Sequence, residues 1–238
     1  MHREMDLCDL CRIGLSVRDS FSMNVMMTPD ATILTAPQFP TTPDEAFAEL
    51  KAGNDRFLSG TTKRGDLLAE ANSTKDGPKA FAVVVSCIDS RTSAELIFDQ
   101  GIGHIFNTRL AGNIVDDAVL GSVEFATKVV GAKLIAVIGH TGCGAVLGAI
   151  GEVELGHLTG VLNQIKPAVT IASSGIAADA CTTTNADFVA KCTEENVRLQ
   201  MRRIIDQSPI VKELLDSGSV RLVGGVHDLG SGKVHFLD

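Results

Sequence analysis

The sequence contains no tryptophan and no tyrosine, so its aromatic contacts depend on ten phenylalanines. It also lacks a basic block, since 21 Lys and Arg face 29 Asp and Glu for a formal charge of −8. This acidic balance argues against nucleic acid as a partner. No run reaches the 18 apolar residues of a spanning helix, so no membrane partner is expected. The first residues lack the apolar centre of a secretion signal, because Glu4, Asp6, Asp9 and Arg12 interrupt it, and a cytoplasmic location is expected.

A disulfide framework is not expected, although the number of cysteines is even. The chain is large, rich in Val, Ile and Leu, and its cysteines are widely spaced: Cys8, Cys11, Cys87, Cys143, Cys181 and Cys192. Such a core does not need covalent cross-links, which favours free thiols or metal ligands. Cys8 and Cys11 form a C-x-x-C without the second pair of a zinc ribbon, and we interpret them as incidental. Cys181 and Cys192 lack partners at a useful spacing and are expected to be packing residues.

Two regions differ in composition. Residues 1–40 contain several prolines and threonines without a sustained period, which predicts an N-terminal arm or a poorly ordered tail that wraps a partner subunit. Residues 41–238 are interpreted as a single domain. It begins with "TTPDEAFAELKAGNDRFLSG", whose start signals and apolar spacing predict an amphipathic helix.

The order of segments predicts an α/β fold. "FAVVVSC" (81–87) and "KLIAVIG" (133–139) read as strands buried on both faces, and "GHIFNTRLAGN" (103–113) as a strand and a turn. Helical segments alternate with them, so we expect a mostly parallel central sheet flanked by helices. Further helices are expected up to residue 218, with an interruption at Ser208-Pro209. "VRLVGGVHDLGSGKVHFLD" (220–238) predicts a strand, a turn and an antiparallel C-terminal edge strand.

Chemically active side chains follow two of the buried strands. Cys87 ends the first, in "SCIDSR", and His140 and Cys143 come just past the third, in "HTGCG". Ligands of open parallel sheets lie beyond the carboxyl ends of the strands, and neighbouring strands are about 4.8 Å apart. If the two strands are neighbours, the three side chains converge. Two thiolates and one imidazole form a zinc set with a vacant fourth position, as in catalytic sites.

Asp89 and Arg91 follow Cys87 closely and leave two states open. Asp89 could take the fourth zinc position, or Arg91 could hold it off the metal so that it accepts a hydrogen bond from zinc-bound water. Gly142 and Gly144 allow a sharp turn, after which a helix N-terminus favours the thiolate of Cys143.

The same residues also allow less specific interpretations. A lone H-x-x-C is more often incidental than a ligand pair, and a strand-end Cys is usually a small buried hydrophobe. A dithiol redox site is a poor alternative, because neither Cys87 nor Cys143 belongs to a C-x-x-C. The remaining histidines are expected to be structural or exposed, with one in the arm: His104, His157, His227, His235 and His2.

"SCIDSR" and "GHTGCGAV" resemble the zinc motifs C-x-D-x-R and H-x-x-C of the β-class carbonic anhydrases. Other segments from about residue 42 to 238 resemble that family in family order, including "AELIFDQGIGHIFNTRLAGNIVD". The resemblance implies reversible hydration of CO2 to bicarbonate and a proton, through attack of zinc-bound hydroxide, with one Zn²⁺ per chain. It implies Cys87, His140 and Cys143 as zinc ligands, and Asp89 and Arg91 as a catalytic dyad.

The resemblance also implies a homodimer or a dimer of dimers, with active sites near the dimer interface. Gly112, Asn113 and Gly144 are expected to line the substrate pocket. The chain departs from the family in "KDGPKAF", which lacks the Gln that many relatives carry there, and in Thr92, where Val is usual. Without Trp and Tyr, the bicarbonate regulatory pocket of one subset is not expected. Two alternatives remain: hydrolysis of CS2 or COS on the same scaffold, and a non-catalytic protein whose zinc site Asp89 closes.

Overall fold

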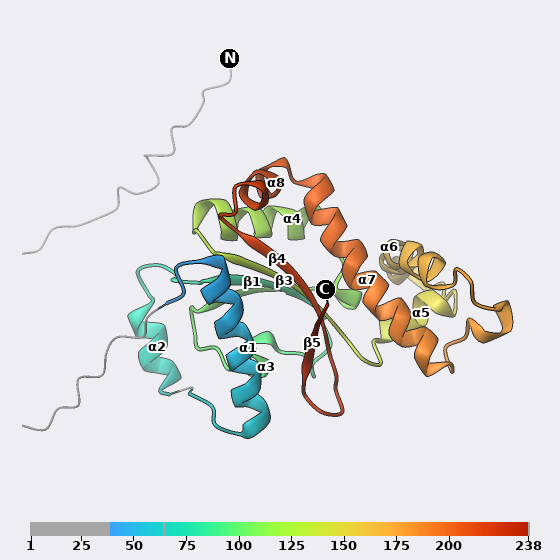
Figure 1. The fold of residues 1–238 in the computed structure, drawn as a ribbon, viewed down its shortest axis with the longest axis horizontal. Helices are drawn as coiled ribbons and strands as arrows, with labels where there is room; N and C mark the ends of the chain where they lie inside the picture. The colour runs from blue at the N-terminus through green and yellow to red at the C-terminus, as the bar shows by residue number, and fades with distance from the viewer. Residues whose placement is uncertain (1–38, 64, 238) are drawn as a thin grey trace, which may run out of the picture. The chain divides into compact units, whose positions relative to one another are not determined.

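The computed structural model describes residues 39–63 and 65–237. The expected N-terminal arm, with Cys8 and Cys11, falls almost entirely on residues 1–38 and lies outside the described residues. From Phe39 onward the chain forms one five-stranded sheet with helices on both faces (Figure 1). None of the helices described is long and apolar enough to cross a membrane.

The sheet has the order β2-β1-β3-β4-β5, in which the first four strands are parallel and β5 runs antiparallel to β4. Its strands are β1 (Ala82–Ser86), β2 (Ile105–Arg109), β3 (Leu134–His140), β4 (Arg221–His227) and β5 (Val234–Leu237). Every residue of β1 and β3 is buried, as their continuous apolar runs predicted. The expected mostly parallel sheet with an antiparallel C-terminal edge strand is therefore confirmed.

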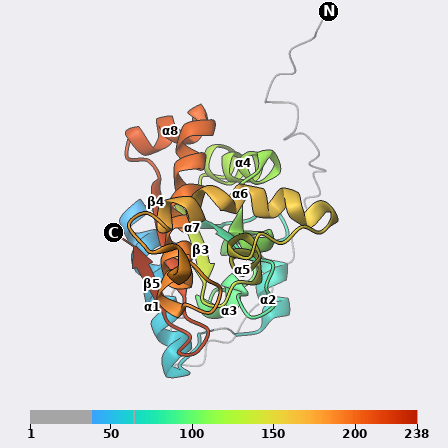
Figure 2. The ribbon, with the colours of Figure 1, turned by 90° about the vertical axis from the view of Figure 1, so that its right-hand side faces the viewer.

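Helices cover the two faces of this sheet. In Figure 1, α1 (Pro43–Ser59) and α3 (Ala94–Ile97) lie on one side, and α4 (Asp117–Glu124), α7 (Ala186–Gln207) and α8 (Pro209–Asp216) on the other. Figure 2 views the molecule from the side where α5 and α6 lie. The remaining helical elements are α2 (Leu67–Ser73), α5 (Gly144–Ile150), α6 (Gly156–Ala172), η2 (Ala111–Asn113), η3 (Phe125–Val129) and η4 (Ala178–Ala180).

The first helix begins and ends as its sequence signals predicted. The Thr42 hydroxyl accepts from the Glu45 N–H at 3.2 Å, and the Glu45 carboxylate accepts from the Thr42 N–H at 3.1 Å, which is a complete capping box. Pro43 occupies the first turn, where its missing N–H has no helical partner to lose. Gly60 ends the helix in the left-handed region, with φ 70°.

A buried side-chain amide connects α1 to α3 and to the β4–β5 turn. Asn54 is 4% exposed, and its Nδ2 donates to the carbonyls of Ile97 at 2.9 Å and Gly232 at 3.1 Å. Its Oδ1 accepts from the Val234 N–H at 2.9 Å. One side chain thus satisfies three backbone groups, which fixes α1 against α3 and the β4–β5 turn.

The helical segment between β2 and β3 is not a regular α-helix along its whole length. It begins as α4 but widens into a π-helical turn, η3. Single π turns interrupt a regular helix and reorient the side chains that follow. Phe125 and Val129, in this turn, are 50% and 64% exposed.

Candidate metal centre

The strand order places the two sequence motifs at the same edge of the sheet. β1 and β3 are direct neighbours, with Ser86 opposite Ile138, so Cys87 and His140 emerge side by side. The Sγ atoms of Cys87 and Cys143 lie 4.0 Å apart, and the donor atoms of Cys87, His140 and Cys143 are all within 4.8 Å of one another. All three residues are buried. The predicted convergence of these side chains is therefore present.

The imidazole of His140 is oriented by a backbone carbonyl. His140 is the last residue of β3, not the first beyond it, and its Nδ1 lies 3.0 Å from the carbonyl oxygen of Thr141. This contact is satisfied when Nδ1 carries the proton, which leaves a lone pair on Nε2. Nε2 is buried, and within residues 39–63 and 65–237 it has no hydrogen-bond partner. A buried nitrogen acceptor without a partner beside two thiols is the arrangement of a metal ligand.

The turn after His140 brings Cys143 back to the site. Gly142 has φ 65°, in the left-handed region that favours glycine, whereas Gly144 does not need that conformation. Cys143 is the N-cap residue of α5. Only one of the two glycines is therefore required by the backbone of the turn.

The contact between the two sulfur atoms shifts the pKa values of the two thiols in opposite directions. The hydrogen bond from Cys143 lowers the pKa of the Cys87 thiol, with smaller help from His140 and the Asp89 and Gly112 N–H groups, against burial. The same sulfur contact, followed by burial, raises the pKa of Cys143, which outweighs the opposing Val146 and Ala145 N–H groups. Binding of a metal ion by both sulfur atoms would require both thiols to lose their protons.

The donor set fits a zinc ion. Two sulfurs that each lie about 2.3 Å from a tetrahedral zinc are separated by roughly 3.8 Å, close to the 4.0 Å between the Cys87 and Cys143 sulfurs. Both cysteines are free thiols, so no disulfide competes for them. Two sulfur donors and one imidazole favour zinc over hard cations such as magnesium or calcium, which prefer oxygen ligands.

Asp89 is held by Arg91 at the rim of this cluster. The guanidinium donates from Nε to Oδ1 at 2.9 Å and from Nη2 to Oδ2 at 2.7 Å, and the Arg91 N–H donates to Oδ1 at 2.9 Å. These hydrogen bonds from Arg91 hold the pKa of the Asp89 carboxyl well below its usual range. Oδ2 also lies 4.0 Å from Nε2 of His140. An ionised carboxylate therefore faces the cluster while both of its oxygens are engaged by an arginine.

The three residues expected to line a substrate pocket occupy different environments. The Gly112 N–H donates to the Cys87 sulfur at 3.4 Å, which places this residue against the cluster. Asn113 is 2% exposed, and its Nδ2 has no hydrogen-bond partner among the described residues. Gly144 is exposed at the start of α5. Gly112 is thus in contact with the site.

Some neighbours of the cluster were not identified from the sequence. His227 was expected to be structural or exposed, and it is buried beside His140, its partner residue on β4. Burial, followed by the neighbouring His140, lowers the pKa of His227. Arg109 binds the loop that carries Cys87. The only feature of the sequence that could have indicated this role is a positively charged residue at the end of a predicted strand. Cys192 is buried in the core, where packing was expected.

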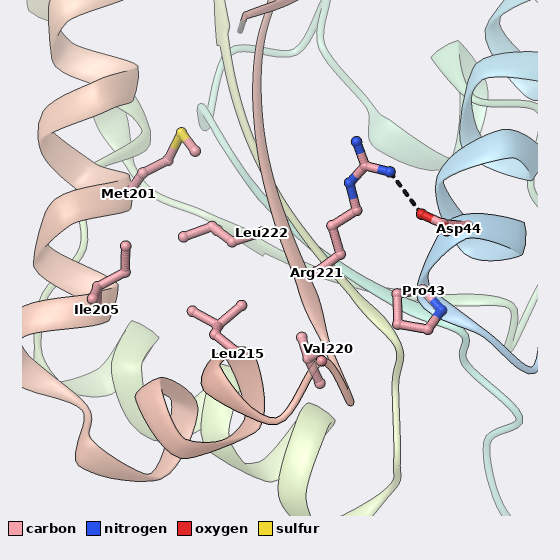
Figure 3. A pocket seen from close by; sticks show the side chains of 9 residues that line it. Pro43, Asp44, Met201, Ile205, Leu215, Val220, Arg221 and Leu222 are labelled. Atoms are coloured by element: carbon pink, nitrogen blue, oxygen red, sulfur yellow. Dashed lines mark hydrogen bonds and ion pairs between the residues drawn. The ribbon is translucent and has the colours of Figure 1, made fainter.

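A separate groove of about 520 Å³ lies at the other end of β4 (Figure 3). Its wall is mostly apolar, with an Arg221–Asp44 ion pair at 2.8 Å on one side. It contains none of the three metal-donor residues. The candidate metal centre is therefore separate from this groove.

Comparisons of the sequence with known proteins match the chain to carbonic anhydrases. The family model "Carbonic anhydrase" matches residues 82–234. The chain is 34% identical over 204 residues to carbonic anhydrase 2 of Mycobacterium tuberculosis, covering 83% of this chain and 94% of that protein. It is 32% identical over 193 residues to the carbonic anhydrase of Pseudomonas aeruginosa, covering 77% and 84%.

Solved structures show the same architecture. A β-carbonic anhydrase of Aspergillus fumigatus superposes with a TM-score of 0.64 at 24% identity, covering 81% of this chain and 90% of that one. One of two tetrameric β-carbonic anhydrases of Sordaria macrospora gives a TM-score of 0.65 at 22% identity, covering 80% and 96%. With this sequence match and this fold, the chain belongs to the β-class carbonic anhydrase family.

Proposed function

We propose that this chain catalyses the reversible hydration of CO2 at one zinc ion held by Cys87, His140 and Cys143. The observation that carries the proposal is the buried cluster of three donor atoms within 4.8 Å, with an ionised carboxylate beside it. Zinc bound there would supply a Lewis acid that lets a water molecule lose its proton near neutral pH. The residues of the chain then have to orient that water and keep the fourth position accessible.

Asp89 and Arg91 are suited to these two tasks. A carboxylate that remains ionised accepts a hydrogen bond from a water molecule beside the metal and so aligns it for attack on CO2. Because both Asp89 oxygens already bind Arg91, the carboxylate is held off the metal. We infer that the fourth position is occupied by water and that Asp89 is an orienting group and not a ligand.

Backbone groups contact two of the proposed zinc donors, Cys87 and His140. The Gly112 N–H donates to the Cys87 sulfur, which withdraws charge from that thiolate. Two thiolates reduce the charge of the metal, so donors to sulfur help it to remain a Lewis acid. The Thr141 carbonyl engages Nδ1 of His140, which leaves Nε2 available to bind the metal.

The decisive experiment combines an activity assay with a zinc count. The purified chain is expected to contain about one zinc per chain and to hydrate CO2 in a stopped-flow assay from neutral to alkaline pH. Parallel assays with CS2 and COS test the alternative substrates. Turnover of CS2 without CO2 hydration would replace the proposed substrate. Zinc near one per chain without hydration at any pH would instead indicate the closed, non-catalytic site.

We further propose that the chain forms a homodimer, or a dimer of dimers, through the β2 side of the sheet. β2 is an edge strand, so its outer backbone groups are available for contact. Phe125 and Val129 lie exposed nearby, and the Phe125 ring contacts that of Phe106 on β2, with centroids 6.2 Å apart. Exposed apolar side chains beside a sheet edge favour association. The tetrameric relatives from Sordaria macrospora provide a precedent.

A further inference from the structure

One guanidinium binds three consecutive carbonyl groups of the loop that follows β1. Nε of Arg109 donates to the Cys87 carbonyl at 3.0 Å, and Nη2 donates to the Ile88 carbonyl at 3.2 Å. Nη2 also donates to the Asp89 carbonyl. The loop segment that carries a proposed zinc ligand and the proposed orienting carboxylate is thus bound along its whole main chain by a single side chain.

The sheet determines where this guanidinium lies. Arg109 is the last residue of β2 and stands opposite Ser86, the last residue of β1. Beyond this pair the ladder continues, with the Leu110 N–H donating to Ser86 at 3.2 Å and the Ile88 N–H donating to Leu110 at 3.3 Å. The side chain of Arg109 therefore starts from a fixed backbone position and extends along the loop.

The partners of Arg109 are carbonyl dipoles and not carboxylates. No ion pair found within residues 39–63 and 65–237 includes it, whereas the nearby Arg91 is paired with Asp89. A planar fork of N–H groups can meet several carbonyls at once, which the compact ammonium of a lysine cannot do. The contact therefore depends on the shape of the guanidinium as well as on its charge.

The loop is also held from inside. Thr92 is 2% exposed, and its hydroxyl donates to the carbonyls of Asp89 at 3.0 Å and Cys87 at 3.3 Å. Arg91 fixes the Asp89 carboxylate, but only Arg109 joins this main chain to the neighbouring strand through a side chain among the contacts described here. With Oδ2 of Asp89 already 4.0 Å from Nε2 of His140, a small shift of the loop would change the approach of the carboxylate to the metal.

We propose that Arg109 is a positioning residue that fixes the main chain from Cys87 to Asp89 and so sets the distance of the Asp89 carboxylate from the metal. The inference rests on the proposed function, since it assigns Asp89 its place beside a zinc ion. Outer contacts of this kind typically change activity or metal affinity by about 10- to 100-fold when they are removed.

The test compares Arg109→Lys, which keeps the charge, with Arg109→Gln, which keeps a neutral amide donor. Both variants are expected to retain cooperative unfolding and zinc, and to lose about 10- to 100-fold in kcat for CO2 hydration. The cobalt-substituted variants are expected to show an altered visible spectrum, because the ligand environment of the metal changes. Arg221→Lys is the matched control, since it changes another arginine at a strand end, whose Asp44 ion pair lies at the opposite end of β4 (Figure 3). It should leave rate and spectrum unchanged.

A double-mutant cycle tests the route through Asp89. If Arg109 acts by placing that carboxylate, Arg109→Lys should add little to the rate loss already caused by Asp89→Asn. Additive losses would overturn the inference, as would an unchanged rate and cobalt spectrum in both Arg109 variants. A wild-type chain without zinc or without hydration would contradict the proposed function itself. If Arg109→Lys does not fold, the cycle is completed with Arg109→Gln.

Discussion

The Sγ atoms of Cys87 and Cys143 lie 4.0 Å apart, so both can bind the same metal ion. Removing either sulfur should therefore abolish the site. Cys87→Ser or Cys143→Ser is expected to weaken zinc binding by at least about 100-fold, more than the loss of an outer contact, and to lose activity with it. Zinc per chain and hydration rate, measured on the same samples, check this. Cys192→Ser, at a buried thiol outside the cluster, should keep the metal. Retention of zinc in both Cys87 and Cys143 variants would exclude them as ligands.

Asp89 should affect rate without affecting metal content. Because both oxygens of its carboxylate bind Arg91, Asp89→Asn is expected to retain zinc and to lose about 10²-fold in kcat, as the amide cannot replace the ionised acceptor. Stopped-flow hydration and a zinc count test this, with the exposed Asp55→Asn on α1 as control. Loss of zinc from Asp89→Asn would show that the carboxylate is a ligand.

For individual residues, the spacing in the sequence predicted that the metal donors converge. It did not predict which residues surround them and hold them in place. Cys87, His140 and Cys143 could be identified because strand ends and parallel order bring them together. Arg109 could not, because its role depends on the register between β1 and β2, which no local pattern encodes. His227 likewise becomes a neighbour of His140 only through pairing of distant strands.

At the scale of elements, α1 and α3 make a contact too close for any side chain. A Cβ added to Gly53 would lie 1.8 Å from the Phe98 carbonyl oxygen. Gly53→Ala must therefore push α1 away from Phe98 at the end of α3, and we expect a loss of about 1–3 kcal/mol in the free energy of unfolding. Urea denaturation measures it. Gly160→Ala, in α6, where an added Cβ would meet no atom within 4 Å beyond its own stretch of helix, should instead stabilise by up to about 1 kcal/mol. Equal effects at both positions would contradict the close contact.

The helices also show where sequence patterns stop being informative. α1 and the break at Ser208 between α7 and α8 carry capping residues and were predicted. α2 was not, because its seven residues include none that is buried and so show no apolar period. The π turn of η3 was not predicted either, because an apolar spacing does not distinguish a single π turn from the α-helix that precedes it.

For the whole molecule, the exposed apolar side chains beside β2 lead to a prediction about assembly. Val129→Glu places a charge at the proposed interface, so it should weaken association by at least about tenfold. Sedimentation velocity over a range of concentrations measures this. Leu155→Glu, at a residue 66% exposed just before α6, is the control. An unchanged mass for Val129→Glu, or an equal loss for Leu155→Glu, would place the interface elsewhere.

The adjacency of β1 and β3 has a consequence for the order in which the protein matures. Cys87 and Cys143 are 56 positions apart, so an unfolded chain has only His140 and Cys143 close together. The third donor arrives when the crossover through β2 and α4 is complete, a non-local event that is slow compared with helix formation. Zinc uptake should therefore follow folding of the sheet. A nascent chain that ends before His140 holds one donor of the three, and so cannot acquire its metal during early synthesis.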